Sequence, residues 1–228
     1  MRERSLSSVP PAALALLVLA LVAQVAWHAL VPARQVAASA LAPAPSLTLL
    51  RLSALGEPLA LAKLLMLHVQ AEDSAQPDGE RLVAWLGRVS DLDPKAHYPL
   101  FAASHVYAEG GDPQRKRQML EFVHQRFMMD PNRRWSDQVY IAMAAKHQLR
   151  DLPLALRYAR ALREQTSATQ VPGWARQMEI FVLEEMNELD SAKILMGGML
   201  ASGQLNDPNE RRFLLERLKA LSARKAKQ

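Results

Sequence analysis

The sequence has no cysteine and few aromatic residues, and each scarcity excludes a class of function. Without cysteine, the chain of 228 residues cannot form disulfides, thiolate zinc sites or a cysteine nucleophile. The absence also fits an oxidising compartment, where a stray thiol is a liability. Aromatic residues make up only 6% of the chain, which argues against sugar stacking and against the platforms that bind single-stranded nucleic acid.

Sequence motifs of catalysis and cofactor binding are absent as well. There is no His-Glu-x-x-His pair, no glycine-rich phosphate loop and no nucleophile elbow. The six histidines do not fall at the i, i+4 spacing of a helical metal site, and we interpret His97 and His105 as a surface or core-edge pair. We therefore expect no catalytic residue, no metal, no cofactor and no small-molecule substrate, and we predict that the protein is not an enzyme.

Charge is missing from the N-terminal region between Arg4 and Arg34. Within this gap, residues 10–31 form an apolar stretch of 22 residues, which as a helix would be about 33 Å long. A hydrocarbon core is about 30 Å thick, so this stretch is predicted to be a transmembrane anchor. One alternative is a signal peptide cleaved at Ala38-Ser39-Ala40, although the apolar stretch is long for that class. The other alternative is that the stretch forms a helix buried in the folded protein.

The basic residues that flank the anchor predict its orientation. Arg2 and Arg4 precede the stretch, and Arg34 opposes them only weakly, so the positive-inside rule places the N-terminal flank in the cytoplasm. Residues 1–9 are then cytoplasmic and residues 35–228 lie outside. In a bacterium, this predicts a single-pass protein of the cell inner membrane whose bulk is periplasmic.

The rest of the chain is predicted to be a linker, one folded domain and a basic tail. Residues 32–46 are rich in Ala and Pro, as linkers are. Residues 47–223 form the domain, because half of the chain is apolar and about 180 residues suffice for a real core. Residues 224–228 end a basic cluster, which we interpret as solvated. Contact with an anionic membrane surface or nucleic acid is the alternative.

Two series of turn residues recur along this domain at nearly constant spacing. The first has intervals of 37, 41 and 36 residues and consists of Pro94, Pro131, Pro172 and Pro208. The second lies halfway between them, has intervals of 39 and 37 residues, and consists of Gly111-Asp112, Arg150-Asp151 and Asn187-Glu188. Each interval holds two segments of helical apolar periodicity, which is typical of a solenoid of helical hairpins.

These patterns predict an all-α protein, in which a transmembrane helix precedes a solenoid of about four α-α hairpins and a capping helix. The predicted helices cover residues 47–71 with a break at Gly56-Glu57-Pro58, 80–92, 95–109, 112–129, 133–148, 152–165, 173–186, 190–201 and 209–223. No alternating run of useful length predicts a strand. The last helix is expected to cover the exposed face of the final repeat.

Three kinds of position recur within residues 80–205. A first helix carries a large residue, a small residue and a tyrosine, which are Leu100, Ser104 and Tyr107. A Gly-Asp-like turn follows at Gly111-Asp112, Arg150-Asp151 and Asn187-Glu188. A second helix carries a small residue, which is Ala155 in one hairpin and Ala192 in the next. In these positions the chain resembles the tetratricopeptide repeat family. It departs from that pattern at Lys116, which replaces the small residue of the second hairpin, and in its longer period. Another α-α solenoid is the alternative.

The resemblance implies a groove that is lined by the first helix of each hairpin and binds an extended peptide or a helix of another protein. Tyr98, Phe101 and His105 follow the spacing i, i+3, i+7 and so share one helix face. Later hairpins carry aromatic residues at or near comparable positions, namely Trp135, Tyr140 and Trp174. These six residues are the predicted partner-binding groove. The alternative is that their rings form core between hairpins.

Two charged groups allow a solvated and a functional interpretation. Arg133-Arg134, beside Trp135, is either a solvated helix start or a clamp for an acidic segment. Glu184-Glu185, with Glu188, is either a solvated acidic face or a contact for a partner or an ion. In each case we favour the solvated interpretation.

The sequence therefore predicts a membrane-anchored protein–protein interaction scaffold or assembly factor of the bacterial cell envelope. Its partners are expected to be other proteins of an envelope or membrane complex, and it meets the membrane itself through residues 10–31. No nucleic-acid partner is expected. The alternative function is that of an accessory or regulatory subunit bound to one integral-membrane enzyme or transport complex.

Overall fold

In a computed structural model, the described residues (11–30, 41–72, 78–109, 112–203, 205 and 207–225) are helical or irregular and contain no strand. The all-α prediction is thereby confirmed. The chain divides into two compact units, Met1–Ser39 and Ala40–Gln228. Predictions for residues 1–10, 31–40, 73–77, 110–111, 204, 206 and 226–228, Gly111 of a predicted turn among them, lie outside the described residues.

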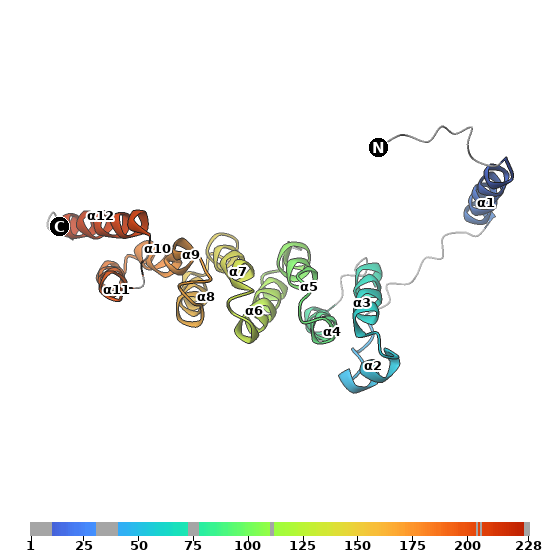
Figure 1. Ribbon diagram of the computed structural model, residues 1–228, viewed down its shortest axis with the longest axis horizontal. Helices are drawn as coiled ribbons and strands as arrows, with labels where there is room; N and C mark the ends of the chain where they lie inside the picture. Colours follow the sequence, from blue (N-terminus) through green and yellow to red (C-terminus); the bar gives the residue numbers. More distant parts are fainter. Residues whose placement is uncertain are drawn as a thin grey trace. The chain divides into compact units, whose positions relative to one another are not determined.

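The first unit contains helix α1, Pro11–Leu30 (Figure 1). Its described side chains are exposed on every side, whereas a helix without a polar face is normally buried in a protein core or a membrane. Within the described part of the chain, no single helix is long and apolar enough to cross a membrane, although Ala15–Ala26 is a shorter apolar stretch. Helices α2 (Leu47–Ser53) and α3 (Pro58–Glu72) together reach that length and composition, but a bend of 116° separates them.

The second unit begins with a segment that is docked rather than free. Leu41 is buried, and the carbonyl oxygens of Leu41, Ala42 and Pro45 accept hydrogen bonds from side chains of helix α4 (Gly79–Leu92). Among these donors, Trp85 Nε1 lies 2.7 Å from the Ala42 oxygen. The C-terminal part of the predicted linker 32–46 thus belongs to the folded unit. Helices α2 (Leu47–Ser53) and α3 (Pro58–Glu72) follow, separated by the predicted break.

The remaining helices agree with the predicted ones to within about three residues at each boundary. They are α4 (Gly79–Leu92), α5 (Tyr98–Phe101), η3 (Ala102–Val106), η4 (Tyr107–Glu109), α6 (Pro113–Met129), α7 (Trp135–His147), α8 (Leu152–Gln165), α9 (Gly173–Arg176), α10 (Met178–Glu185), α11 (Leu189–Ala201) and α12 (Pro208–Lys225). Asp112 and Asp151 cap α6 and α8 by accepting hydrogen bonds from backbone amides of the first turn, which fixes these starts.

Two predicted helices are less regular than expected. The segment 95–109 becomes helical only at Tyr98, and its middle, η3, is a π-helix that ends in the 3₁₀ turn η4. The segment 173–186 is divided into α9 and α10 at Gln177. The first helices of these two hairpins are therefore the irregular ones, whereas α6 and α8 are continuous.

Consecutive helices of the second unit pack against one another in chain order, as hairpins require (Figure 1). The pair α7–α8 is the most extensive, because small residues allow close approach: Ala142, Ala145, Ala155 and Ala159 are all buried. One continuous core runs from Leu41 to Val182, and a second one joins α10, α11 and α12. The apolar stripe of α6 is fully buried and consists of Met119, Leu120, Val123 and Phe127.

Three of the charged residues interpreted as solvated are instead structural, whereas Glu185 and Glu188 are exposed. Arg134 is buried and donates to the Pro94 carbonyl, while Arg133 donates to the Lys95 carbonyl at 2.7 Å. Glu184 is mostly buried and accepts from Arg217 Nε at 3.0 Å, which joins α10 to α12. The solvated interpretation was wrong at these positions because each charge ties a helix to its neighbour.

Candidate functional site

Four of the predicted groove residues form a continuous row of stacked rings. The ring centroids of Tyr98 and Phe101 are 6.3 Å apart, those of Phe101 and His105 4.3 Å, and those of His105 and Tyr140 3.6 Å. The first three rings come from the α5–η3 segment and Tyr140 comes from α7, so the row joins two successive hairpins. We call these four residues the aromatic row.

The aromatic row has an open end and a packed end. Tyr98 and Phe101 are 45% and 47% exposed, whereas His105 and Tyr140 are partly buried. A large aromatic ring that is nearly half exposed has apolar surface left for a partner to cover. The row therefore lies at the surface and is held there by its own stacking.

The opposite face of the same segment is buried, which explains why the rings point outward. Leu100, Ser104 and Tyr107 are at most 3% exposed, as the resemblance implied. Ser104 Oγ donates to the Leu100 carbonyl at 2.9 Å and also lies 2.9 Å from His105 Nδ1. The π-helical turn adds a residue to the helical turn, and the amide of Tyr107 reaches back to the Ala102 carbonyl. Such turns are frequent at functional sites.

An apolar hollow lies beside the open end of the row. Its volume is about 470 Å³, within the range of pockets that accept large side chains or small ligands. It is lined by α3, by the C-terminal end of α4 and by the segment that leads into α5, including Ala62, Met66, Leu67, Val89, Tyr98 and Pro99. Gln70 donates a hydrogen bond to the Tyr98 hydroxyl and so connects α3 to the row.

The other two predicted groove residues form a separate pair. Trp135, at the start of α7, and Trp174, in α9, meet edge to face with centroids 5.7 Å apart. Trp174 is 52% exposed, whereas Trp135 is partly buried against the core. The six residues therefore make two clusters, each of which joins the first helices of adjacent hairpins.

A carboxylate that the sequence did not mark lies next to the row. Asp137 is three residues before Tyr140 on α7, and its side chain is 16% exposed. Its Oδ2 is 3.9 Å from His97 Nδ1 and has no hydrogen-bond partner among the described residues. Burial raises the pKa of Asp137, and the positive charges of His97, Arg134 and His105 oppose that rise. Asp137 is thus a buried carboxyl group beside the row, and it faces His97.

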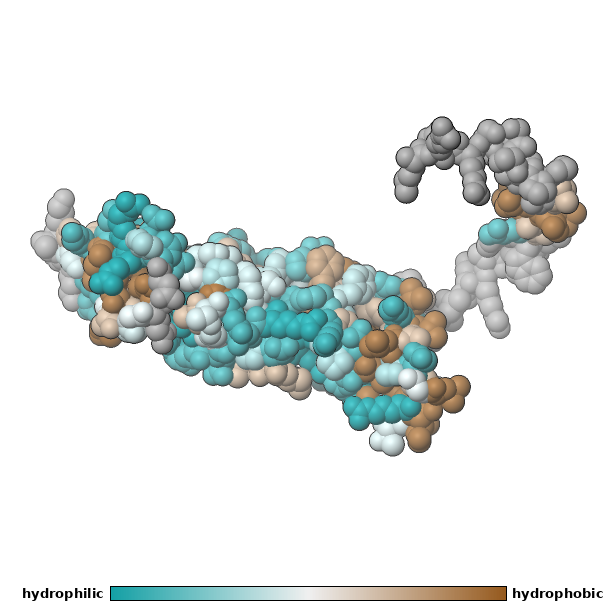
Figure 2. Space-filling model, in the orientation of Figure 1, coloured by the Kyte–Doolittle hydropathy of each residue, from teal (hydrophilic) through white to brown (hydrophobic). Residues whose placement is uncertain are grey.

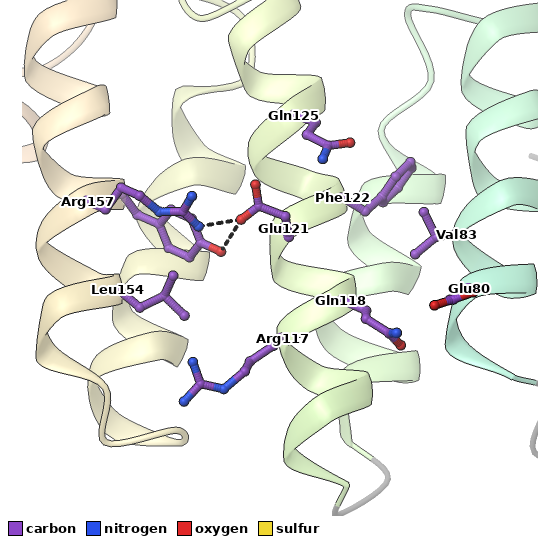
Figure 3. A pocket seen from close by; sticks show the side chains of 10 residues that line it. Glu80, Val83, Arg117, Gln118, Glu121, Phe122, Gln125, Leu154 and Arg157 are labelled. Atoms are coloured by element: carbon purple, nitrogen blue, oxygen red, sulfur yellow. Dashed lines mark hydrogen bonds and ion pairs between the residues drawn. The ribbon is translucent and has the colours of Figure 1, made fainter.

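A second hollow, of about 550 Å³, lies across α4, α6 and α8 (Figure 3). Glu121 points toward Arg157 and accepts hydrogen bonds from it and from the Tyr158 hydroxyl, the latter at 3.2 Å. Burial raises the pKa of Tyr158 and keeps the phenol protonated. Arg117 is paired with Asp151. Because its principal charges already neutralise one another, this hollow is the weaker binding candidate.

Among the described residues, no group of three or more His, Asp or Glu side chains is placed to hold a metal ion. His97 and His105 do not form a pair, since His97 faces Asp137 and His105 stacks between Phe101 and Tyr140. Comparison of the chain with family models, with curated proteins and with solved structures finds no match. Function is therefore inferred from the geometry of the chain itself.

Proposed function

We propose that this chain is a membrane-anchored helical-repeat protein of tetratricopeptide-like type that binds another protein of the cell envelope through its aromatic row. The observation that carries the proposal is the row itself: four rings from two hairpins contact one another in sequence, and Tyr98 and Phe101 at its open end remain nearly half exposed. Surface aromatics that are held rigidly in this way lose little entropy on binding and are typical anchors of protein interfaces.

The surroundings of the row suggest the chemistry of its partner. The apolar hollow next to Tyr98 would accept a large aliphatic or aromatic side chain. His97 also lines this hollow, and its Nδ1 is 3.9 Å from the largely buried carboxylate of Asp137. A partner segment that places an apolar residue in the hollow and a nearby Lys or Arg over the exposed rings of Tyr98 and Phe101 would suit this surface, because a cation over an aromatic face is attracted to it.

The anchor is the second part of the proposal. It is supported by the uncharged stretch 10–31, which contains helix α1 and its shorter apolar stretch Ala15–Ala26. The basic residues Arg2 and Arg4 favour a cytoplasmic N-terminus and a periplasmic repeat domain.

Site-specific crosslinking in native membranes tests the binding surface. A photoreactive phenylalanine analogue in place of Phe101 should crosslink to a partner. The same analogue in place of Phe213, an equally exposed ring on α12, is the matched control and should crosslink much less. Equal or greater crosslinking from Phe213 would place the partner elsewhere. Mass spectrometry of the products separates a scaffold, with several partners, from an accessory subunit with one integral-membrane partner.

A further inference from the structure

Helices α2 and α3 expose an unusual amount of apolar side chain. Six leucines on these helices and on the turn between them are between 52% and 91% exposed: Leu49, Leu52, Leu55, Leu59, Leu64 and Leu67. In Figure 2 hydrophobic residues gather over this part of the second unit. We call these six residues the leucine face. Single exposed leucines are ordinary, but a contiguous apolar patch marks an interaction site.

Helix α12, at the C-terminal end of the repeat domain, has the composition of a terminal helix that faces water. Most of the exposed residues of α12 are polar or charged, among them Asn209, Arg211, Arg212, Glu216 and Lys219. Solenoids need such polar outer faces on their terminal helices to remain soluble. By contrast, residues 47–72 carry only four charged side chains, and leucine is their commonest residue. The N-terminal end of the domain is therefore built to be covered.

The chain itself brings a membrane close to this end. Leu41 is fixed against α4, so only residues 31–40 separate the docked chain from the end of α1. Ten residues span at most about 36 Å when fully extended. If α1 is in the bilayer, the docked chain at Leu41, six residues before α2, lies within about that distance of the point where α1 leaves it. This step rests on the anchor proposed above.

The apolar surface of α1 decides whether a bilayer or α1 itself covers the leucine face. Helix α1 is apolar around its circumference, with seven of its large side chains at least 60% exposed, from Leu16 to Val25. Packing α1 on the leucine face would cover one stripe of α1 and leave the rest of it in water. A bilayer covers both surfaces together. The bend of 116° prevents α2 and α3 from forming one straight span, so they suit a position along the membrane surface.

We propose that the leucine face is a second membrane contact, which lies in the interfacial region of the same bilayer that holds α1. Leucines enter the boundary between headgroups and acyl chains, and the basic side chains of Arg51 and Lys63, both exposed, remain at headgroup level. This contact restricts the rotation of the repeat domain about its tether and holds the neighbouring hollow beside the membrane.

Fluorescence quenching by lipid tests the contact, and the absence of native cysteine makes each label unique. The full chain is reconstituted in vesicles of phosphatidylethanolamine and phosphatidylglycerol, with or without brominated acyl chains. An environment-sensitive dye is attached to Leu52→Cys or to Leu64→Cys. Brominated lipid should quench both by about two-fold or more, as expected for interfacial insertion. A dye on the exposed Ser222→Cys of α12 is the control and should not respond.

The pattern of quenching separates the two proposals. Quenching at Leu19→Cys in α1 without quenching at Leu52→Cys and Leu64→Cys would overturn the leucine-face contact and leave the anchor intact. Absence of quenching at Leu19→Cys would overturn the anchor and this contact with it. A blue-shifted signal at the leucine positions that lipid does not quench would show a protein cover, either α1 or a second copy, and would also overturn the proposal.

A charged variant guards against insertion driven by the dye itself. The double change Leu52→Glu with Leu59→Glu should abolish lipid quenching of a dye at Leu67→Cys, because carboxylates resist transfer into the interface. Quenching at Leu19→Cys and the helical circular dichroism should stay unchanged, since both leucines are exposed. Undiminished quenching at Leu67→Cys would contradict the proposal.

Discussion

Arg150 and Asn187 adopt the same left-handed backbone conformation at corresponding turns of two successive hairpins, with φ of 53° and 60°. In each turn, the backbone amide of the next residue donates a hydrogen bond to a carbonyl of the preceding helix. Asp151 donates to Ala145 at 2.9 Å, and Glu188 donates to Leu183 at 2.8 Å. Left-handed residues commonly end helices in this way. The 37-residue interval in the sequence thus corresponds to a repeated local structure.

Replacing Arg150 by Gly should stabilise the protein. A non-glycine residue in this conformation costs about 1–2 kcal/mol, part of which is offset by the greater freedom of Gly in the unfolded chain, so a net gain of up to about 1 kcal/mol is expected. Asn187→Gly should gain less, because Asn tolerates this conformation. Urea denaturation measures both. If Arg150→Gly is no more stable than the control Arg150→Ala, the turn assignment is incorrect.

Ala155 tests the close packing of the helix pairs. Its side chain is fully buried on α8, where the resemblance implies a small residue. Ala155→Trp should destabilise the domain by about 1–3 kcal/mol through overpacking. Gln165→Trp, at an exposed position at the end of the same helix, should change stability by less than about 0.5 kcal/mol. Equal effects of the two changes would show that Ala155 does not lie at a helix contact.

Asp137 and Asp151 should give opposite pH dependences. The pKa of Asp137 is raised by burial, so its ionised form disfavours folding, and the wild type should gain stability relative to Asp137→Asn as pH falls toward about 4. The pKa of Asp151 is lowered, first by the backbone amide of Leu154. The wild type should therefore lose stability relative to Asp151→Asn as pH falls below about 4. Thermal melts across this range measure both differences, and parallel trends would contradict these environments.

The topology of the chain can be tested with reporter fusions. A reporter that is active only in the periplasm, fused after Gln228, should be active, because Arg2 and Arg4 favour a cytoplasmic N-terminus. Activity of a cytoplasmic reporter alone would reverse the orientation. Release of a shortened soluble chain would instead indicate that the N-terminal stretch is a cleaved signal peptide.

Most helix boundaries were predictable because the sequence marks them locally. Asp112 and Asp151 cap their helices through short-range hydrogen bonds, and the turn residues recur at a regular interval. The buried stripe of α6 was predictable for the same reason, since its apolar periodicity is a property of one helix.

Features that depend on neighbouring helices were not predictable. Residues 47–71 are apolar almost throughout, and periodicity did not separate the buried Met66 and Val69 from the exposed Leu64 and Leu67. That division depends on which side of α3 its neighbour covers. No sequence pattern predicted the π-helical turn that contains His105, whose ring stacks on Tyr140. The burial of Arg134 depends on the preceding loop, where the Pro94 carbonyl accepts its hydrogen bond.

The most direct test of the account compares the two faces of the α5–η3 segment. Tyr98→Ala with Phe101→Ala should weaken partner capture from solubilised membranes by roughly ten-fold or more, as at interface hot spots, with little change in melting temperature, because both rings are nearly half exposed. Leu100→Ala, on the buried face, should cost about 2–5 kcal/mol of stability and spare capture in the cold. If the double variant unfolds and still captures partners in the cold, the aromatic row is core and not a binding surface.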